Sequence, residues 1–149
     1  MEIIANALQT VQANQSVYFT DTIVGGNNSI SHRSNSGIVS LLGNTNQCRA
    51  RFKITFGANI AVPTGETVGP ISLAIAIDGE AVPSTTMTVT PAAVETFFNV
   101  FSAIFVDVPR SIMSSISVRN ISTIPVEVSS VKYNSYLTML SWELSKIIY

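Results

Sequence analysis

The clearest pattern along the chain is a strict alternation of apolar and polar residues over 49–56, RARFKITF. Successive side chains of a β-strand point to opposite faces, so this period of two predicts a strand with one buried and one solvated face. The polar positions include three cations, Arg49, Arg51 and Lys53. We interpret them as a solvated sheet face or as partners in intersubunit ion pairs, with ligand binding as the alternative.

Residues 71–77, ISLAIAI, carry large aliphatic residues at one set of alternate positions and small residues at the other. This pattern predicts a strand that is buried on both faces. The following Asp78-Gly79 dipeptide favours a tight hairpin, because glycine adopts positive φ without steric cost. A calcium loop needs a longer series of oxygen ligands than Asp78 and Glu80 provide, so we interpret this tip as a turn.

The most apolar run, 94–108, contains four phenylalanines and fits either a strand or a helix. Its β-branched and aromatic content and the proline at position 109 favour a strand. That strand would have Val100, Ile104 and Val106 on one face and Phe101 and Phe105 on the other. Because both faces carry large apolar residues, we expect one of them to be buried against a neighbouring subunit.

Several shorter segments also have the composition of strands, and turn residues separate them. These segments are one strand within 1–12 that carries Ile4, Leu8 and Val11, a second at 17–19, two short strands or one bulged strand in 30–42, and others at 86–90, 115–119 and 126–131. Residues 57–70 are expected to form a loop with room for one short extended piece, whereas 136–149 fit either a helix or a continued strand. Short strands spaced roughly 8–12 residues apart predict an all-β sandwich in one domain.

Composition adds an expectation about assembly. Hydrophobic residues make up 46% of the 149 residues and charged residues only 11%, against about 25% charged residues in an average domain. A surface with so few charges predicts burial against other copies of the chain. The net charge of −1 gives no basic surface for nucleic acid, and no apolar run is long enough for a transmembrane helix or a secretory signal.

Residue types that carry chemistry are scarce. His32, the single histidine, lies in a polar stretch without a nucleophile motif, so we interpret it as a surface or interface residue. Cys48, the single cysteine, is interpreted as a small apolar filler. We therefore predict no catalytic residue, no metal and no cofactor. The enzymatic alternative is a hydrolase that uses Glu66 or Glu80 at a subunit boundary.

Three segments in order, 46–80, 84–109 and 116–122, give the chain a resemblance to a known group. They resemble jelly-roll domains of the TNF/C1q-like type, in the small clostridial and phage-associated form similar to the C-terminal domain of BclA. The resemblance covers about residues 3–131 and implies a jelly-roll β-sandwich that assembles as a homotrimer, with apolar and aromatic residues along the axis. The candidates for this interface or for the core are Phe97, Phe101, Phe105, Tyr136 and Trp142.

The same resemblance implies a role without catalysis. It indicates a structural protein of a phage or prophage virion, as a head decoration, fibre or tail component, whose partners are its own copies, other virion proteins or a host-surface glycan. The alternative is a glycan- or receptor-binding trimer on a bacterial cell or spore surface, with loops 25–29 and 57–70 as candidate contacts. The chain lacks the G-X-Y repeat of a collagen-like stalk, and residues 132–149 are a candidate C-terminal extension of the single domain.

Overall fold

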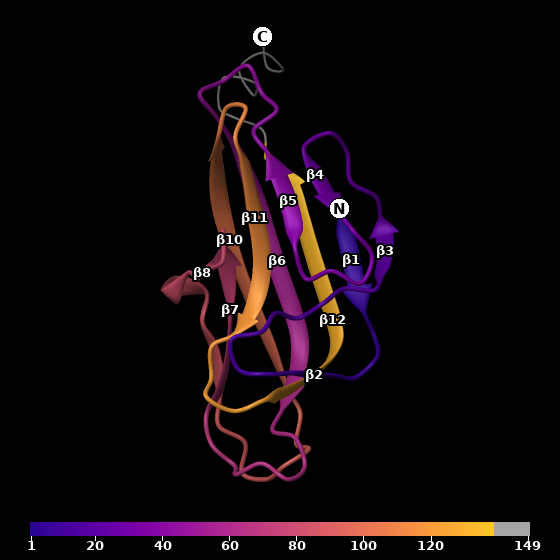
Figure 1. Ribbon diagram of the computed structural model, residues 1–149, viewed down its shortest axis with the longest axis vertical. Coiled ribbons are helices and arrows are strands. Elements are labelled where there is room, and N and C mark those ends of the chain that lie inside the picture. The colour runs from indigo at the N-terminus through magenta and orange to yellow at the C-terminus, as the bar shows by residue number, and fades with distance from the viewer. Residues whose placement is uncertain (139–149) are drawn as a thin grey trace.

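Two six-stranded antiparallel sheets pack face to face in the computed structural model, which describes residues 1–138 (Figure 1). The first sheet has the order β10 (Phe98–Pro109), β6 (Arg49–Ala61), β12 (Val126–Leu137), β1 (Glu2–Ala5) and β3 (Asp21–Val24), and β2 (Gln9–Val11) also pairs with β12. The second has the order β4 (Ile30–His32), β5 (Val39–Leu42), β11 (Met113–Asn120), β7 (Ile71–Ile77) and β8 (Glu80–Ala81), and β9 (Met87–Val89) also pairs with β7.

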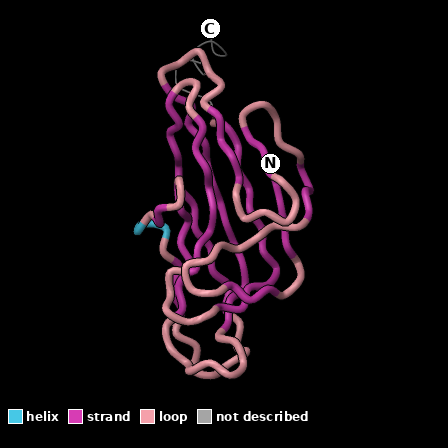
Figure 2. Tube along the Cα trace, in the orientation of Figure 1, coloured by secondary structure: helices cyan, strands magenta, loops and turns pink. Residues whose placement is uncertain are grey.

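The long strands follow the long axis of the molecule, and loops gather at its two ends (Figure 2). A single short 3₁₀ turn, η1 (Pro83–Thr85), is the one helical element within residues 1–138. No helix in this part of the chain has the length and apolar character that crossing a membrane requires. The predicted all-β sandwich is confirmed, as are two strands within 30–42, a strand within 86–90 and one that spans 115–119.

Strand β6 supplies the middle of the core. Its even-numbered residues Phe52, Ile54 and Phe56 are fully buried, which confirms the predicted alternation. The strand continues to Ala61, so the extended piece of the segment 57–70 is its first part, 57–61, which belongs to β6 and not to a separate loop. Gly57 does not end the strand because β10 and β12 pair with it on both sides and hold the backbone extended.

Strand β10 confirms the choice of strand over helix for the phenylalanine-rich run. Val100, Val106 and Val108 point into the sandwich and are buried. Phe101 and Phe105 point to the opposite side and are exposed. Within the described residues β10 pairs with β6 alone, so it is an edge strand.

The hairpin between β7 and β8 is also confirmed. Asp78 and Gly79 have φ angles of 53° and 85°, and a two-residue type I′ turn requires positive φ at both positions. The Asp78 carboxylate accepts a hydrogen bond from the backbone N–H of Ser115 at 2.9 Å, which fixes the turn to β11. The carboxylate therefore has a structural role in the turn.

The N-terminal segment differs from its prediction. Ile3, Ala5 and Val11 face the core, whereas Ile4 is half-buried and Leu8 is 54% exposed. The segment forms two strands rather than one, and buried Gln9 begins the second. Weak alternation over small residues did not specify which face was buried.

The strand expected at 17–19 is wrong, although Val17 and Phe19 are fully buried. The backbone N–H of Val17 donates to Val118 O, and that of Tyr18 donates to the side chain of Gln9 at 3.0 Å. Single bonds to a β11 carbonyl and to a side chain therefore take the place of a continuous ladder with one neighbouring strand. The segment is extended and hydrogen-bonded without belonging to a regular ladder.

Strand β12 runs beyond its expected end at Val131 and reaches Leu137. A β-bulge at Ser130, where φ is 51°, shifts the register between Ser129 and Lys132. Residues 132–137 therefore pair with β6 inside the first sheet. The remainder of the predicted extension, 139–149, lies outside the described residues, and Trp142 lies there with it.

Candidate functional site

The outward side of the first sheet presents an exposed group of aromatic side chains, which we call the aromatic face. Phe101 and Phe105 of β10 are 64% and 57% exposed, and Tyr136 of β12 is 47% exposed. Phe105 and Tyr136 are both paired in register with Lys53 of β6, one from each side. The Lys53 ammonium lies 5.3 Å from the centre of the Phe105 ring, within cation–π range.

The cations predicted on this side of β6 are largely satisfied within the chain. Arg51 donates to both carboxylate oxygens of Asp107, at 2.8 and 3.1 Å, and Arg49 lies 3.5 Å from the same carboxylate. Hydrogen bonding to Arg51 holds the pKa of Asp107 below its ordinary value. For these two arginines, the structure shows ion pairs within the chain, and pairs between subunits stay a prediction. Lys53 has no carboxylate partner among the residues described.

A shallow hollow of about 330 Å³ lies in the aromatic face, where Gly57 leaves β6 without a side chain. Phe101 and Lys132 flank it, and Lys132 is tied to Glu2 by an ion pair of 3.1 Å. A Cβ atom at position 57 would approach Val100 O at 3.6 Å and the Phe101 ring at 3.7 Å, which are ordinary contacts. The hollow therefore exists because a side chain is missing, not because the backbone needs glycine.

The structure brings together three of the five aromatic residues predicted for the interface or core. Phe101, Phe105 and Tyr136 form the aromatic face. Phe97 is 40% exposed just before β10, about 13 Å from Phe101 along an extended chain. All four residues are exposed on the chain, which leaves the interface as the open alternative for them. Trp142 lies in the part of the chain that the structure does not describe.

Two carboxyl groups that no sequence pattern singled out meet near the end of β6. Thr64 donates to a carboxylate oxygen of Glu95 from its backbone N–H at 3.1 Å and from its hydroxyl at 2.9 Å. Burial, a hydrogen bond to Glu95 and repulsion by its charge raise the pKa of Glu127 to about 7. The pair therefore shares a proton in mildly acidic solution and holds the turn at Glu95 against β12. Neither Glu66 nor Glu80 belongs to it.

His32 lies at the end of β4, half-buried beside an open pocket, which agrees with the predicted surface position, and its ring also packs inward. Its ring meets that of Phe19 edge-on, with 5.8 Å between the centroids. Its Nε2 lies 2.8 Å from the carbonyl oxygen of Ser36. A carbonyl only accepts hydrogen bonds, so Nε2 carries the hydrogen and donates it.

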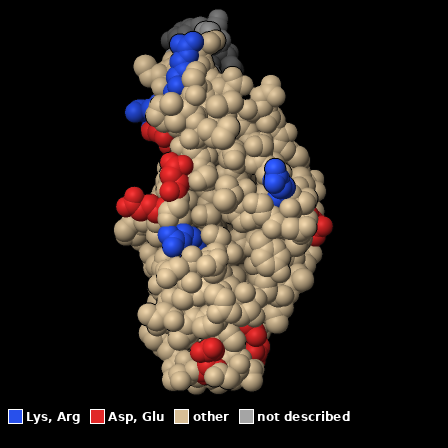
Figure 3. Space-filling model, in the orientation of Figure 1, with Lys and Arg blue, Asp and Glu red and all other residues tan. Residues whose placement is uncertain are grey.

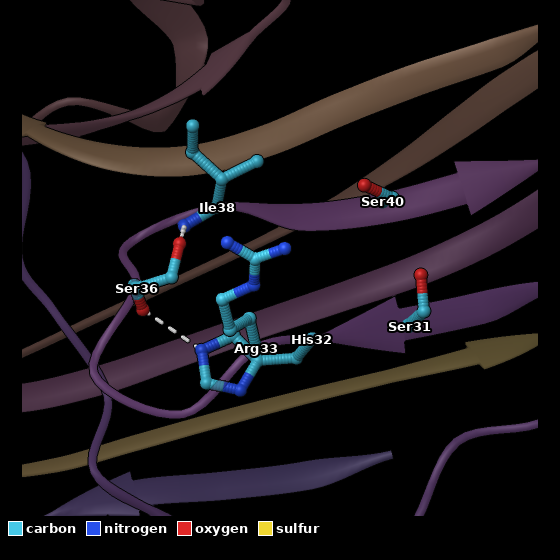
Figure 4. Close-up of a pocket in the computed structure, with 6 residues that line it drawn as sticks. All are labelled: Ser31, His32, Arg33, Ser36, Ile38 and Ser40. Atoms are coloured by element: carbon cyan, nitrogen blue, oxygen red, sulfur yellow. Dashed lines mark hydrogen bonds between the residues drawn. The ribbon is translucent and has the colours of Figure 1, made fainter.

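An open pocket of about 470 Å³ adjoins His32 on the second sheet (Figure 4). Arg33 and Ile38 lie at its rim, and both are exposed. Its full lining comprises Ser31, His32, Arg33, Ser36, Ile38 and Ser40. The pocket thus combines one guanidinium, several hydroxyl groups and one aliphatic side chain.

The other sequence-based candidates lie elsewhere. Loop 25–29 and the loop after β6 lie at opposite ends of the sandwich, so they do not form one binding cluster (Figure 1). Cys48 is exposed just before β6, so its interpretation as a buried filler is wrong. No group of three metal-ligating side chains occurs within residues 1–138.

Comparison with known proteins identifies the architecture. No protein-family model matches the chain, and no curated protein sequence matches it. The globular domain of zebrafish complement 1qA protein matches in structure with a TM-score of 0.63 and 11% identity, over 93% of this chain and 95% of that one. The chain has a C1q/TNF-like jelly-roll fold.

Weaker structural matches accompany this one. The C1q/TNF-like jelly roll also matches rabbit GITRL with a TM-score of 0.43 and 14% identity, over 76% of this chain and 81% of that one. The C-terminal domain of EclA, described as a sugar-binding protein, matches with a TM-score of 0.43 and 12% identity, over 87% of this chain and 79% of that one. The predicted jelly roll is confirmed as a fold, and its trimeric assembly stays a prediction.

Proposed function

We propose that this C1q/TNF-like chain is a non-enzymatic structural protein that assembles as a homotrimer through its aromatic face. In this proposal it is a component of a phage or prophage virion, where it stabilises the particle or displays a binding surface. The bacterial cell surface is the alternative location. The observation that carries the proposal is the exposure of Phe101, Phe105 and Tyr136 on one side of one sheet.

The energy available from this face favours association. Complete burial of a large apolar side chain contributes about 1.5–3 kcal/mol, and these three side chains are half exposed, so each offers about 1 kcal/mol per subunit. Aromatic residues are also enriched at the centres of protein interfaces. In a closed ring every copy buries the same face, so the ring gains this burial free energy once for each subunit.

Most of the charges around the face are paired within the chain, and Lys53, which has no carboxylate partner among the described residues, lies over the Phe105 ring. Asp107 is held by Arg51, and Lys132 is paired with Glu2. An ion pair that already exists within a subunit costs less to desolvate than a lone charge. Three copies are the number that the sequence resemblance implies, and the shared fold supports that choice.

The non-catalytic part of the proposal is supported by the side chains themselves. The single histidine donates to a backbone carbonyl, and the carboxylates of Asp78 and Asp107 are bound to turn and sheet partners. Little charge is visible on the side of the molecule shown in Figure 3, which suits a protein that meets other proteins over much of its surface.

Mass measurement in solution tests the assembly. We expect a particle of three times the 16.0 kDa chain mass. The double variant Phe101→Thr/Phe105→Thr should shift it toward monomer while the β-sheet circular dichroism is retained. The control Ile112→Thr/Met113→Thr changes two side chains of similar exposure, 51% and 61%, and should stay trimeric. A wild-type monomer at high concentration would contradict the proposal.

The location is tested separately. Mass spectrometry of particles released by the producing bacterium, purified away from cells, should find the chain at a fixed ratio to the other particle proteins. Its recovery from cell envelopes alone would favour the bacterial surface instead.

A further inference from the structure

The pocket beside the turn between β4 and β5 belongs to the second sheet, whereas the aromatic face belongs to the first. It therefore stays outside the surface that we assign to assembly. The inference drawn from it goes beyond the proposed function and does not depend on trimer formation.

Arg33 gives the pocket an available positive charge. No carboxylate within residues 1–138 forms a salt bridge with Arg33, whereas Arg51 and Lys132 are paired within the chain. Figure 4 shows its guanidinium group over the pocket, on the side where Ile38 and Ser40 lie. An arginine fork binds a carboxylate through two parallel hydrogen bonds, which gives direction as well as attraction.

Two hydroxyl groups stand next to each other on the pocket wall. Ser31 of β4 and Ser40 of β5 are directly opposite in the antiparallel register. Their Cβ atoms are therefore about 5 Å apart. Neither hydroxyl forms a side-chain hydrogen bond in the described chain, so both can donate and accept. Ile38, which is 52% exposed, adds an apolar surface at the rim.

The turn that carries Arg33 is held in place before any ligand arrives. Asn35 adopts a φ of 66°, and its backbone N–H donates to Phe19 O at 2.9 Å. The N–H of Ser36 donates to Arg33 O at 3.0 Å, and His32 donates to Ser36 O at 2.8 Å. A site that is already ordered loses little conformational freedom on binding.

We propose that this pocket binds a carboxylated sugar of the uronic acid class. The carboxylate lies on the Arg33 guanidinium, ring hydroxyls bond to Ser31 and Ser40, and an apolar face of the ring contacts Ile38. A lone cation surrounded by hydroxyls and one aliphatic side chain suits a polyol with a single negative charge. It suits inorganic phosphate less, because phosphate sites usually supply several donors or charges.

Titration of the full chain tests the site, with backbone amide NMR as the readout. The probes are methyl glucuronide, methyl glucoside, which has the same ring without a carboxylate, and inorganic phosphate. We expect saturable shifts confined to residues around 31–40 with the glucuronide at millimolar concentrations. Binding of the glucoside and of phosphate should be weaker by about tenfold or more.

Variants identify the groups responsible. Arg33→Gln should weaken glucuronide binding about tenfold, and Ser31→Ala/Ser40→Ala should weaken it as well. Arg110→Gln, at another exposed arginine, is the matched control and should bind like the wild type. None of these variants should change the solution mass, so the result does not depend on whether the chain is trimeric.

Three outcomes would overturn the inference. Equal affinity for glucuronide and glucoside would show that the site does not recognise the carboxylate. Phosphate binding as tight as glucuronide binding would show a site for charge alone. Absence of saturable shifts at residues 31–40 up to about 10 mM would show no site for this ligand.

Discussion

At the scale of single residues, Glu127 links the fold to pH. Its pKa rises from 4.5 to about 7 in the folded protein, so the folded state binds more protons than the unfolded chain between these values. Stability from this group is therefore complete below pH 4.5 and falls as pH rises to about 7. The pKa of Glu95 is lowered by its hydrogen bonds to Glu127 and Thr64, so its contribution is lost on acidification below its ordinary value.

The variant Glu127→Gln tests this linkage. A glutamine can still bond to Glu95 but cannot ionise, so the loss of stability between pH 5 and 7 should disappear. Above pH 7 the variant should be more stable than wild type by up to about 1 kcal/mol, after allowance for solvent screening. Urea unfolding over pH 4–8 measures this difference. Parallel pH profiles for the two proteins would contradict it.

Asn120 is a second residue whose role is clear from its contacts. It is fully buried, and its amide donates to Val11 O and Ile124 O, both at 2.9 Å. Its carbonyl oxygen accepts from the N–H and hydroxyl of Ser122, at 2.9 and 2.6 Å. One side chain thereby joins β11, β2 and the turn before β12.

Replacement of Asn120 by alanine should therefore be costly. The change removes the amide donor from the buried Val11 carbonyl and from the partly buried Ile124 carbonyl, so we expect a loss of about 2–4 kcal/mol in the free energy of unfolding. Chemical denaturation measures it. Asn99→Ala is the control, because Asn99 bonds to Asn59 in an exposed pair and should lose less than about 1 kcal/mol. Similar losses for both variants would show that burial of Asn120 is not the cause.

At the scale of elements, strands with strong alternation could be predicted from the sequence. The conformation of β6 follows from the period of two in its own side chains. The conformation of the Asp78-Gly79 turn follows from the access of glycine to positive φ. Short segments could not be predicted as well. Val17 and Phe19 are buried, yet the N–H of Val17 donates to Val118 O and that of Phe19 donates to Ser36 O, and no local pattern reveals these partners.

Of the candidate functional residues, likewise, some could be predicted from a local pattern and others could not. Exposure of Phe101 and Phe105 on one face followed from the strand period in β10. The pocket at Arg33 did not, because it depends on the pairing of Ser31 with Ser40 and on the tie from His32 to Ser36. Such a site is created by register between two very short strands, and register is a tertiary property.

Substitution of two glycines by alanine should have opposite effects on the free energy of unfolding. Gly79→Ala should destabilise the protein by about 1 kcal/mol, because alanine resists the φ of 85° in the hairpin. Gly57→Ala should be neutral or stabilising by up to about 1 kcal/mol, since the added Cβ meets only ordinary contacts and the unfolded chain loses freedom. Thermal unfolding compares them directly. Destabilisation of equal size would contradict the assignment at Gly57, and a neutral Gly79→Ala would contradict the assignment at Gly79.

At the scale of the whole molecule, the two sheets present different chemistry. The first carries the aromatic face, with most of its charges paired within the chain, and the second carries the pocket of hydroxyls and Arg33. In our proposals the first meets other copies and the second meets a ligand. Association by an apolar face should respond little to ionic strength.

Salt dependence therefore tests the nature of the assembly. The dissociation constant of the oligomer, measured by analytical ultracentrifugation, should change less than about threefold between roughly 0.05 and 1 M sodium chloride, where screening shortens from above 10 Å to about 3 Å. The double variant Phe101→Thr/Phe105→Thr should remain dissociated at both concentrations. A steep weakening of the wild-type oligomer with salt would indicate an ionic interface instead.

The bulge at Ser130 has a consequence for how this sheet can change through insertion and deletion. Beyond it, Tyr133 and Ser135 face inward while Lys132, Asn134 and Tyr136 face outward. Ser129 pairs with Asn59 and Lys132 pairs with Gly57, so the two residues between them oppose Ala58 alone. Loss of Ser130 would therefore restore a regular ladder and leave both sets on their present faces, since side chains alternate with a period of two. The bulge is thus a point where the strand can gain or lose a single codon while its tyrosine stays on the outer wall and its lysine stays out of the interior.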